Sequence, residues 1–236
     1  MSSYIRVSAG VALVLALAIA GVALHISRGP LPIDTTIMAA TNELHTPHRT
    51  LVVGVLTEMF SPWAVIVSTA LVAVILYVRD ANVVRVVTVI ATVASAGALC
   101  ATLKVLVARP RPPVTDQLGV LETTYSFPSG HVTGTAALVV ALASLVARSA
   151  GGITRAAVWL CASVTIAIVC ATRLYLGVHW ISDVVAAVVV ACAATLFVNP
   201  IVELAAATWM SRRGHRPSAN QTRTRSRSHH THVTSH

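Results

Sequence analysis

The sequence predicts an all-α polytopic membrane protein, with six transmembrane helices in one bundle and a disordered basic C-terminal tail. Of its 236 residues, 56% are hydrophobic and 11% are charged, whereas a soluble domain carries about 25% charged residues. The mean hydropathy is +0.77, and several apolar stretches reach the about 20 residues that a helix needs to cross a bilayer. Four cysteines are too few for a disulfide scaffold, and the apolar content excludes a disordered body.

The six spans follow one another along residues 1–210, which we expect to form one membrane domain. They are Val7–Ile26, Ser61–Val78, Val83–Val107, Val132–Ala147, Ile153–Ala171 and Trp180 to about Thr208. Asn199-Pro200 in the last span predicts a kink. Ala18-Ile19-Ala20 in the first span resembles a signal-peptidase site, but the apolar run continues through Leu24, which favours a retained helix.

Two segments lie outside the spans. Residues 28–60 contain Pro30, Pro32 and a polar run, which together predict a loop with one short amphipathic helix. The apolar stretch Leu51–Leu56 within this segment is too short to cross a membrane. Residues 211–236 are rich in Arg, Ser, Thr and His, and we expect them to be a disordered cytoplasmic tail.

The charge distribution predicts the orientation. The formal net charge is +9, and with the N-terminus inside, most of the 17 Lys and Arg residues fall in cytoplasmic segments. We therefore expect both termini in the cytoplasm. The ratio of 16 arginines to one lysine, with many Ala and Val residues, is typical of a GC-rich bacterial genome, so we expect the protein in a bacterial plasma (inner) membrane. The basic tail has no interleaved aromatic residues, so membrane lipids are the expected partners, not nucleic acid. The sequence carries no signal for the oligomeric state.

Three polar motifs fall at helix ends that this orientation places on the outer face. The first runs from Lys104 to Pro112 at the end of the third span, and the second from Pro128 to His131 at the start of the fourth. The third runs from Thr172 to Asp183 and bridges the end of the fifth span and the start of the sixth. Charged residues at such positions are costly and usually functional.

The residue types in these motifs indicate an anion site. Lys104, Arg111 and Arg173 supply three cations, and the arginine fork suits the oxygens of a phosphate. Ser129 and Gly130 open a helix, whose free N–H groups and positive dipole end attract an anion.

Two histidines add chemistry to this anion site. Of His131 and His179, one can attack phosphorus while the other protonates the leaving oxygen. The residue types do not say which of them attacks. Asp183 follows His179 by four residues, which on a helix places both on one face. A carboxylate there can orient the imidazole and stabilise its charged form.

The three motifs resemble the signature of the type 2 phosphatidic acid phosphatase (PAP2) superfamily, K-x6-RP, PSGH and SR-x5-H-x3-D. Thr172 is the one departure, standing where the family usually has serine, and its hydroxyl leads us to expect little change. The resemblance implies a six-span lipid phosphatase that needs no metal or other cofactor and forms a phosphohistidine intermediate.

The resemblance also implies a role for each motif residue. His179 would be the nucleophile, Asp183 would orient it, and His131 would be the general acid. The phosphate would be bound by Lys104, Arg111, Ser129, Gly130 and Arg173. Expected substrates are phosphatidic acid, phosphatidylglycerol phosphate or a polyprenyl diphosphate at the outer membrane face. A lipid phosphotransferase with the same intermediate and a non-catalytic lipid-phosphate binder or transporter are the alternatives.

Residues near the motifs receive simpler interpretations. Arg109 lies outside the family pattern and is interpreted as a loop cation. Asp116 and Glu122 are interpreted as solvated loop acids, and Phe127 as a packing residue. Trp180 fits the aromatic belt at a membrane interface.

Overall fold

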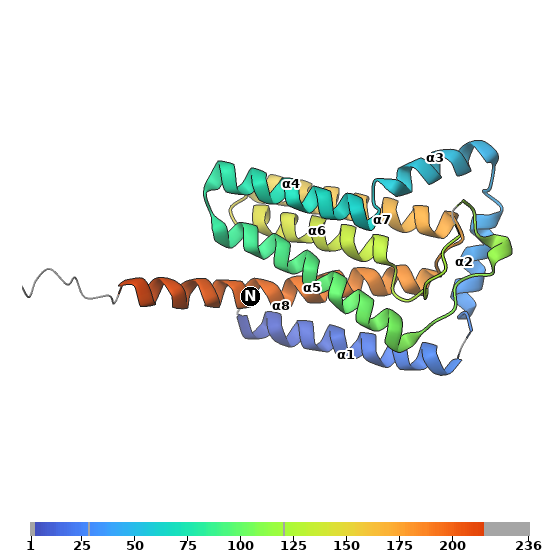
Figure 1. Ribbon diagram of the computed structural model, residues 1–236, viewed down its shortest axis with the longest axis horizontal. Coiled ribbons are helices and arrows are strands. Elements are labelled where there is room, and N and C mark those ends of the chain that lie inside the picture. The colour runs from blue at the N-terminus through green and yellow to red at the C-terminus, as the bar shows by residue number, and fades with distance from the viewer. Residues whose placement is uncertain (1–2, 28, 120, 215–236) are drawn as a thin grey trace, which may run out of the picture. The chain divides into compact units, whose positions relative to one another are not determined.

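The computed structural model describes residues 3–27, 29–119 and 121–214, and all regular structure in this part of the chain is helical (Figure 1). The elements are α1 (Ser3–Ser27), α2 (Pro32–Asn42), α3 (Pro47–Glu58), α4 (Pro62–Asp80), α5 (Val83–Val107), the 3-10 helix η1 (Val114–Asp116), α6 (Gly130–Ala147), α7 (Gly152–Tyr175) and α8 (Ile181–Gly214). The all-α prediction is confirmed. The described part of the chain divides into two units, one that ends at Val202 and one that begins at Glu203.

Six of the described helices, α1 and α4 to α8, are long and apolar enough to cross a membrane. The prediction of six spans is therefore confirmed, and α5 has the predicted bounds. α7 continues four residues beyond the predicted end, to Tyr175. α8 includes Pro200 and continues to Gly214, so only residues 215–236 of the predicted tail lie outside the described residues.

The prediction of one short helix in residues 28–60 is wrong, because this segment forms both α2 and α3. Each helix begins with a proline at its first position, where the missing N–H costs nothing and the fixed φ suits a helix. Asp34 accepts a hydrogen bond from the Leu31 N–H at 2.8 Å, and Thr46 caps α3 by accepting one from the Arg49 N–H. Both helices contact α7.

Small side chains let the spans of the first unit approach one another closely, as is common between membrane helices. α5, α6 and α8 contribute Ala96, Ala136 and Ala191 to a buried cluster, and α1 adds Leu17 and Leu24. This packing fixes the ends of α5, α6 and α8 relative to one another. The polar motifs occupy those ends.

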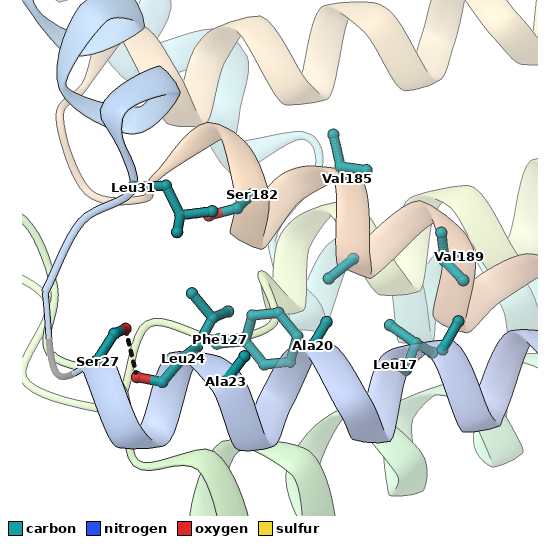
Figure 2. A pocket seen from close by; sticks show the side chains of 12 residues that line it. Leu17, Ala20, Ala23, Leu24, Ser27, Leu31, Phe127, Ser182, Val185 and Val189 are labelled. Atoms are coloured by element: carbon teal, nitrogen blue, oxygen red, sulfur yellow. Dashed lines mark hydrogen bonds between the residues drawn. The ribbon is translucent and has the colours of Figure 1, made fainter.

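An apolar cavity of about 510 Å³ lies between α1 and the beginning of α8 (Figure 2). Leu17 and Leu24 line it from α1 and Val185 from α8, and the ring of Phe127 lies between the two helices. Phe127 is buried, as expected for a packing residue. None of the predicted site residues lines this cavity.

The predicted convergence of the three motifs is present in the structure. α5 and α7 end, and α6 and α8 begin, at the same end of the helices, where α2 and α3 also lie (Figure 1). The loop from residue 108 to residue 129 connects α5 to α6 there. Hydrogen bonds join this loop to the turn between α7 and α8, for example from the Leu118 N–H to the Leu176 carbonyl at 2.9 Å.

Candidate active site

The eight predicted site residues all lie at this end of the bundle. Lys104 is in the last turn of α5, and Arg173 is in the last turn of α7. The positions from the loops and from the helix starts are Arg111, Ser129, Gly130, His131, His179 and Asp183.

His179 lies in the turn before α8 and is 4% exposed. Its Nδ1 lies 3.5 Å from Asp183 Oδ2 and 3.4 Å from Ser126 Oγ. On the other side of the ring, Arg111 Nη1 donates to Nε2 at 3.2 Å. A guanidinium can only donate, so Nε2 accepts and the ring proton belongs on Nδ1, facing Asp183.

Burial, together with the nearby guanidinium of Arg111, lowers the pKa of His179, and Asp183 opposes them; the net pKa falls from 6.5 to about 4. The imidazole is therefore neutral near pH 7, with a lone pair on Nε2. A neutral imidazole is the form that can act as a nucleophile.

Asp183 is held by several donors. Ser126 Oγ donates a short hydrogen bond to Oδ2, and the Trp180 N–H donates to the same oxygen at 2.9 Å. Arg109 Nη1 lies 2.6 Å from Oδ1. Ser126 was not among the predicted site residues, because a lone serine in a loop carries no sequence signal for this role.

The interpretation of Arg109 as a loop cation is wrong. Its side chain is 1% exposed and bridges Asp183 and Asp34, with a distance of 2.6 Å to each carboxylate. Asp34, on α2, also accepts hydrogen bonds from the backbone N–H and the hydroxyl of Ser182. A buried cation with two buried carboxylates thus joins α2 to the first turn of α8.

The aromatic-belt prediction for Trp180 is also wrong. The side chain is buried, its Nε1–H donates to the Pro110 carbonyl at 3.1 Å, and the Arg109 guanidinium lies 5.8 Å from the ring centre. Trp180 therefore packs over the buried charge network beside the site.

Two of the predicted phosphate-binding cations are fixed by the protein itself. Arg111 donates to the carbonyls of Thr124 at 2.6 Å and Val178 at 2.7 Å. Arg173 is buried, and its Nη1 donates to Thr57 Oγ at 3.0 Å. The two guanidinium groups are thus held in place before a substrate binds.

The interpretation of Glu122 as a solvated acid is wrong. Its Oε1 lies 2.7 Å from Arg173 Nη2, and its Oε2 lies 3.3 Å from Arg111 Nη2. Burial opposes ionisation, but Arg111 and Arg173 outweigh it and hold the pKa of Glu122 below its ordinary value. Glu122 is therefore an ionised carboxylate between the two arginines.

The remaining predicted residues surround this centre. Lys104 Nζ donates to the Tyr125 carbonyl at 2.6 Å, in the loop that carries Glu122. Ser129 is the N-cap of α6, and its buried Oγ has no partner among the described residues. A Cβ added at Gly130 would meet no atom within 4 Å, so there is open space at this helix start.

A pocket of about 590 Å³ opens beside Arg173 and Glu122. Leu51, Val55, Leu118, Leu176 and Val178 form its apolar walls, and Thr50, Thr57, Glu58, Ser61, Glu122, His131 and Arg173 are its polar lining. The pocket thus combines the cation of Arg173 with several apolar side chains, which suits a molecule with an anionic head and a hydrocarbon body.

Gly177 shapes the turn that delivers His179. Its φ is +64°, a conformation that glycine adopts without the cost that a Cβ would add. A Cβ at this position would lie 2.1 Å from the Asp116 carbonyl oxygen. The close approach of the α5–α6 loop therefore requires glycine here.

The described residues contain no group of three or more His, Cys, Asp or Glu side chains that could hold a metal ion. The chemistry that this arrangement offers comes from a neutral histidine, a second histidine and fixed cations. Such a set can attack a phosphorus atom and stabilise the charge that develops on its oxygens.

Comparisons with known proteins agree with the motifs and with the fold. One solved structure is a PAP2-type phosphatidylglycerolphosphate phosphatase from Bacillus subtilis, 20% identical with a TM-score of 0.68, over 80% of this chain and 95% of that one. Another is LpxE from Aquifex aeolicus, 16% identical with a TM-score of 0.56, over 71% of this chain and 95% of that one. Curated protein sequences gave no significant match. The sequence profile of the PAP2 superfamily matches residues 85–206, a range that covers more than half of the chain and includes all eight predicted site residues. The chain therefore belongs to the PAP2 superfamily and is a membrane phosphatase of the PAP2 type.

Proposed function

We propose that this phosphatase hydrolyses a lipid phosphate monoester or a lipid diphosphate at the outer membrane face, through a phosphohistidine on His179. The observation that carries the proposal is the position of the His179 ring between Arg111 and Asp183. Its Nε2 faces Arg111 at 3.2 Å, and its Nδ1 side faces a carboxylate. The amphiphilic pocket beside it supports a lipid as the substrate.

In the first step, the lone pair on His179 Nε2 attacks phosphorus. A P–N bond forms while the bond from phosphorus to the leaving oxygen breaks. His131 lines the pocket beside Arg173 and donates a proton to the leaving oxygen. Asp183 stabilises the positive charge that the imidazole acquires.

In the second step, water attacks the phosphohistidine. His131, now neutral, takes a proton from this water, the P–N bond breaks, and inorganic phosphate leaves. Arg111 and Arg173, with Lys104 and the N–H groups at the start of α6, bind the phosphate oxygens in both steps.

Two features support a lipid in preference to a small soluble phosphate. Leu51 and Val55 on α3 and Met59 at its C-cap are exposed, and Leu51 and Val55 also line the pocket. A hydrocarbon chain placed beside Leu51 and Val55 would therefore contact apolar side chains while its phosphate reaches Arg173. Substrates with an apolar body gain from such contact in proportion to the area that they bury.

The test is phosphate release by purified protein in detergent with EDTA present. The lipids are phosphatidic acid, phosphatidylglycerol phosphate and a polyprenyl diphosphate, with His179→Ala as the control. We expect release by the parent only, and acid-labile label on the parent protein after rapid quenching with 32P-labelled lipid. Equal release by His179→Ala would refute the phosphohistidine route, and release abolished by EDTA would refute the metal-independent one.

The membrane face is tested separately in a cysteine-free variant. Glu43→Cys places a thiol between α2 and α3, at the motif end, and Ser149→Cys places one between α6 and α7, at the opposite end. With a membrane-impermeant maleimide on intact cells, we expect label at position 43 and none at position 149. The reverse pattern would place the site on the cytoplasmic face.

A further inference from the structure

Glu122 lies where an anionic substrate group would be expected to bind. Its two carboxylate oxygens each meet one guanidinium, Oε1 at 2.7 Å from Arg173 and Oε2 at 3.3 Å from Arg111. These are the donors that suit two oxygens of a phosphate group. Two anions cannot share these donors without strong repulsion, because like charges a few ångströms apart disfavour each other.

We propose that Glu122 is an internal competitor, which occupies the phosphate position of the empty enzyme and must be displaced before any anionic headgroup binds. This inference rests on the proposed function, since it assigns the two arginines to the substrate phosphate. Glu122 then acts as a specificity-determining residue, because only a headgroup that binds the two arginines more strongly than Glu122 does can displace it.

The charges of the arginines, of Glu122 and of the headgroup determine which headgroups can displace Glu122. Arg111 and Arg173 carry two positive charges, and Glu122 neutralises one of them. A phosphodiester headgroup carries a single negative charge, so exchanging it for Glu122 gains no charge interaction. A phosphate monoester or a terminal diphosphate group approaches two negative charges near pH 7, so the same exchange is favourable. Abundant phosphodiester lipids are thereby kept out of a site that lies beside them.

Glu122 is free to leave because the arginines do not depend on it. Arg111 keeps its bonds to the carbonyls of Thr124 and Val178, and Arg173 keeps its bond to Thr57. The Glu122 side chain is 29% exposed, so its carboxylate can rotate toward water. Its own N–H is held by the Gln117 side chain at 3.3 Å, so the loop backbone need not move.

The test compares Glu122→Gln, which keeps the size of the side chain and removes its charge, with Glu58→Gln. Glu58 lines the same pocket, and its carboxylate makes no hydrogen bond or ion pair in the described structure, so it controls for a general loss of negative charge. In Glu122→Gln we expect the inhibition constant of inorganic phosphate to fall by about tenfold, the lower end for a lost charge-assisted hydrogen bond. KM should fall with it, with kcat largely unchanged, and Glu58→Gln should change either constant by less than threefold.

Phosphatidylglycerol in mixed micelles provides the specificity measurement. It should inhibit Glu122→Gln competitively at contents that leave the parent unaffected. A lower kcat with weaker phosphate binding in Glu122→Gln would overturn the proposal, since that pattern would make Glu122 a positioning residue for the arginines. An equal response of Glu58→Gln would overturn it as well.

A binding readout separates this inference from the proposed reaction. This measurement uses the His179→Ala variant, because phosphate binding can be followed without turnover. Inorganic phosphate should raise the midpoint of thermal unfolding more in the double variant His179→Ala, Glu122→Gln than in His179→Ala alone. If the parent hydrolyses none of the lipids but this difference remains, the reaction fails and the competitor role stands. If hydrolysis is observed and the difference is absent, the competitor role fails alone.

Discussion

Replacing Arg109 with methionine removes the cation that bridges Asp34 and Asp183, and it strands two carboxylates inside the protein. Both carboxylates are fully buried, and each lies 2.6 Å from the guanidinium. Breaking a buried ion pair by removing one partner costs about 3–5 kcal/mol, because the remaining charge is left without compensation. We therefore expect Arg109→Met to lower the free energy of unfolding by at least about 3 kcal/mol.

Arg85 offers a matched control. It pairs with Asp80 at the same distance of 2.6 Å, but the two side chains are 43% and 30% exposed. Exposed ion pairs contribute about 0–1 kcal/mol, because water solvates the partner that remains. Arg85→Met should therefore lower the free energy of unfolding by no more than about 1 kcal/mol.

The assay is reversible unfolding in mixed micelles with increasing SDS, followed by circular dichroism. A third variant, Arg109→Met with Asp34→Asn, removes one stranded charge and should recover part of the lost stability. Because Asp183 is the other stranded carboxylate, kcat should remain low in both Arg109 variants. Two results would refute the reasoning that burial makes the charges of this network costly to leave unpaired. One is an equal loss of stability in Arg109→Met and Arg85→Met, and the other is no recovery of stability when Asp34→Asn is added to Arg109→Met.

Four further predictions concern His179 and its surroundings. Gly177→Ala should lower both stability and kcat, because the new Cβ would clash with the Asp116 carbonyl. Gly152→Ala, where the added Cβ meets no atom within 4 Å, should leave stability and kcat unchanged. Thermal unfolding and initial reaction rates of the two variants check this prediction. Asp183→Asn should reduce kcat on the order of 10²–10⁴-fold with little change in KM, since orientation and charge stabilisation are lost; steady-state kinetics that show a mainly raised KM would contradict this. The acid limb of kcat/KM, corrected for the substrate's own ionisation by 31P NMR, should approach about pH 4 and not lie near 6.5, because His179 must be neutral to attack and its pKa is lowered. The same shift makes the protein lose stability as the pH falls from 6.5 toward 4, because the unfolded chain takes up a proton there that folded His179 does not.

The spans and motif residues could be predicted because each rests on a local requirement. A helix such as α5 must present about 20 apolar residues to cross a bilayer, and its polar neighbours on either side mark where it ends. Lys104 and Arg111 stand at a fixed spacing, as do His179 and Asp183, because the chemistry needs those residue types together. Local rules of this kind do not depend on distant parts of the chain.

The residues that were missed depend on contacts between segments far apart in the sequence. Arg109 meets Asp34 across a separation of 75 residues, and the sequence of residues 28–60 did not predict that α2 would bring Asp34 to the site. The two prolines that suggested a loop, Pro30 and Pro32, lie beside and at the first position of α2. Glu122 was missed for a similar reason, since nothing in the loop sequence shows that Arg173 lies beside it.

Arg109 and Arg111 are separated by one proline, yet their carboxylate partners differ in exposure and therefore in whether they can be displaced. Asp183 is fully buried against Arg109, so removing either charge leaves the other without water, and this pair is a permanent part of the fold. Glu122 pairs with Arg111 at a longer distance and at 29% exposure, so water can solvate its carboxylate when another anion takes its place. An incoming phosphate can therefore exchange with Glu122 but not with Asp183. This difference leaves Asp183 in place to orient His179 while the neighbouring guanidinium groups receive the substrate.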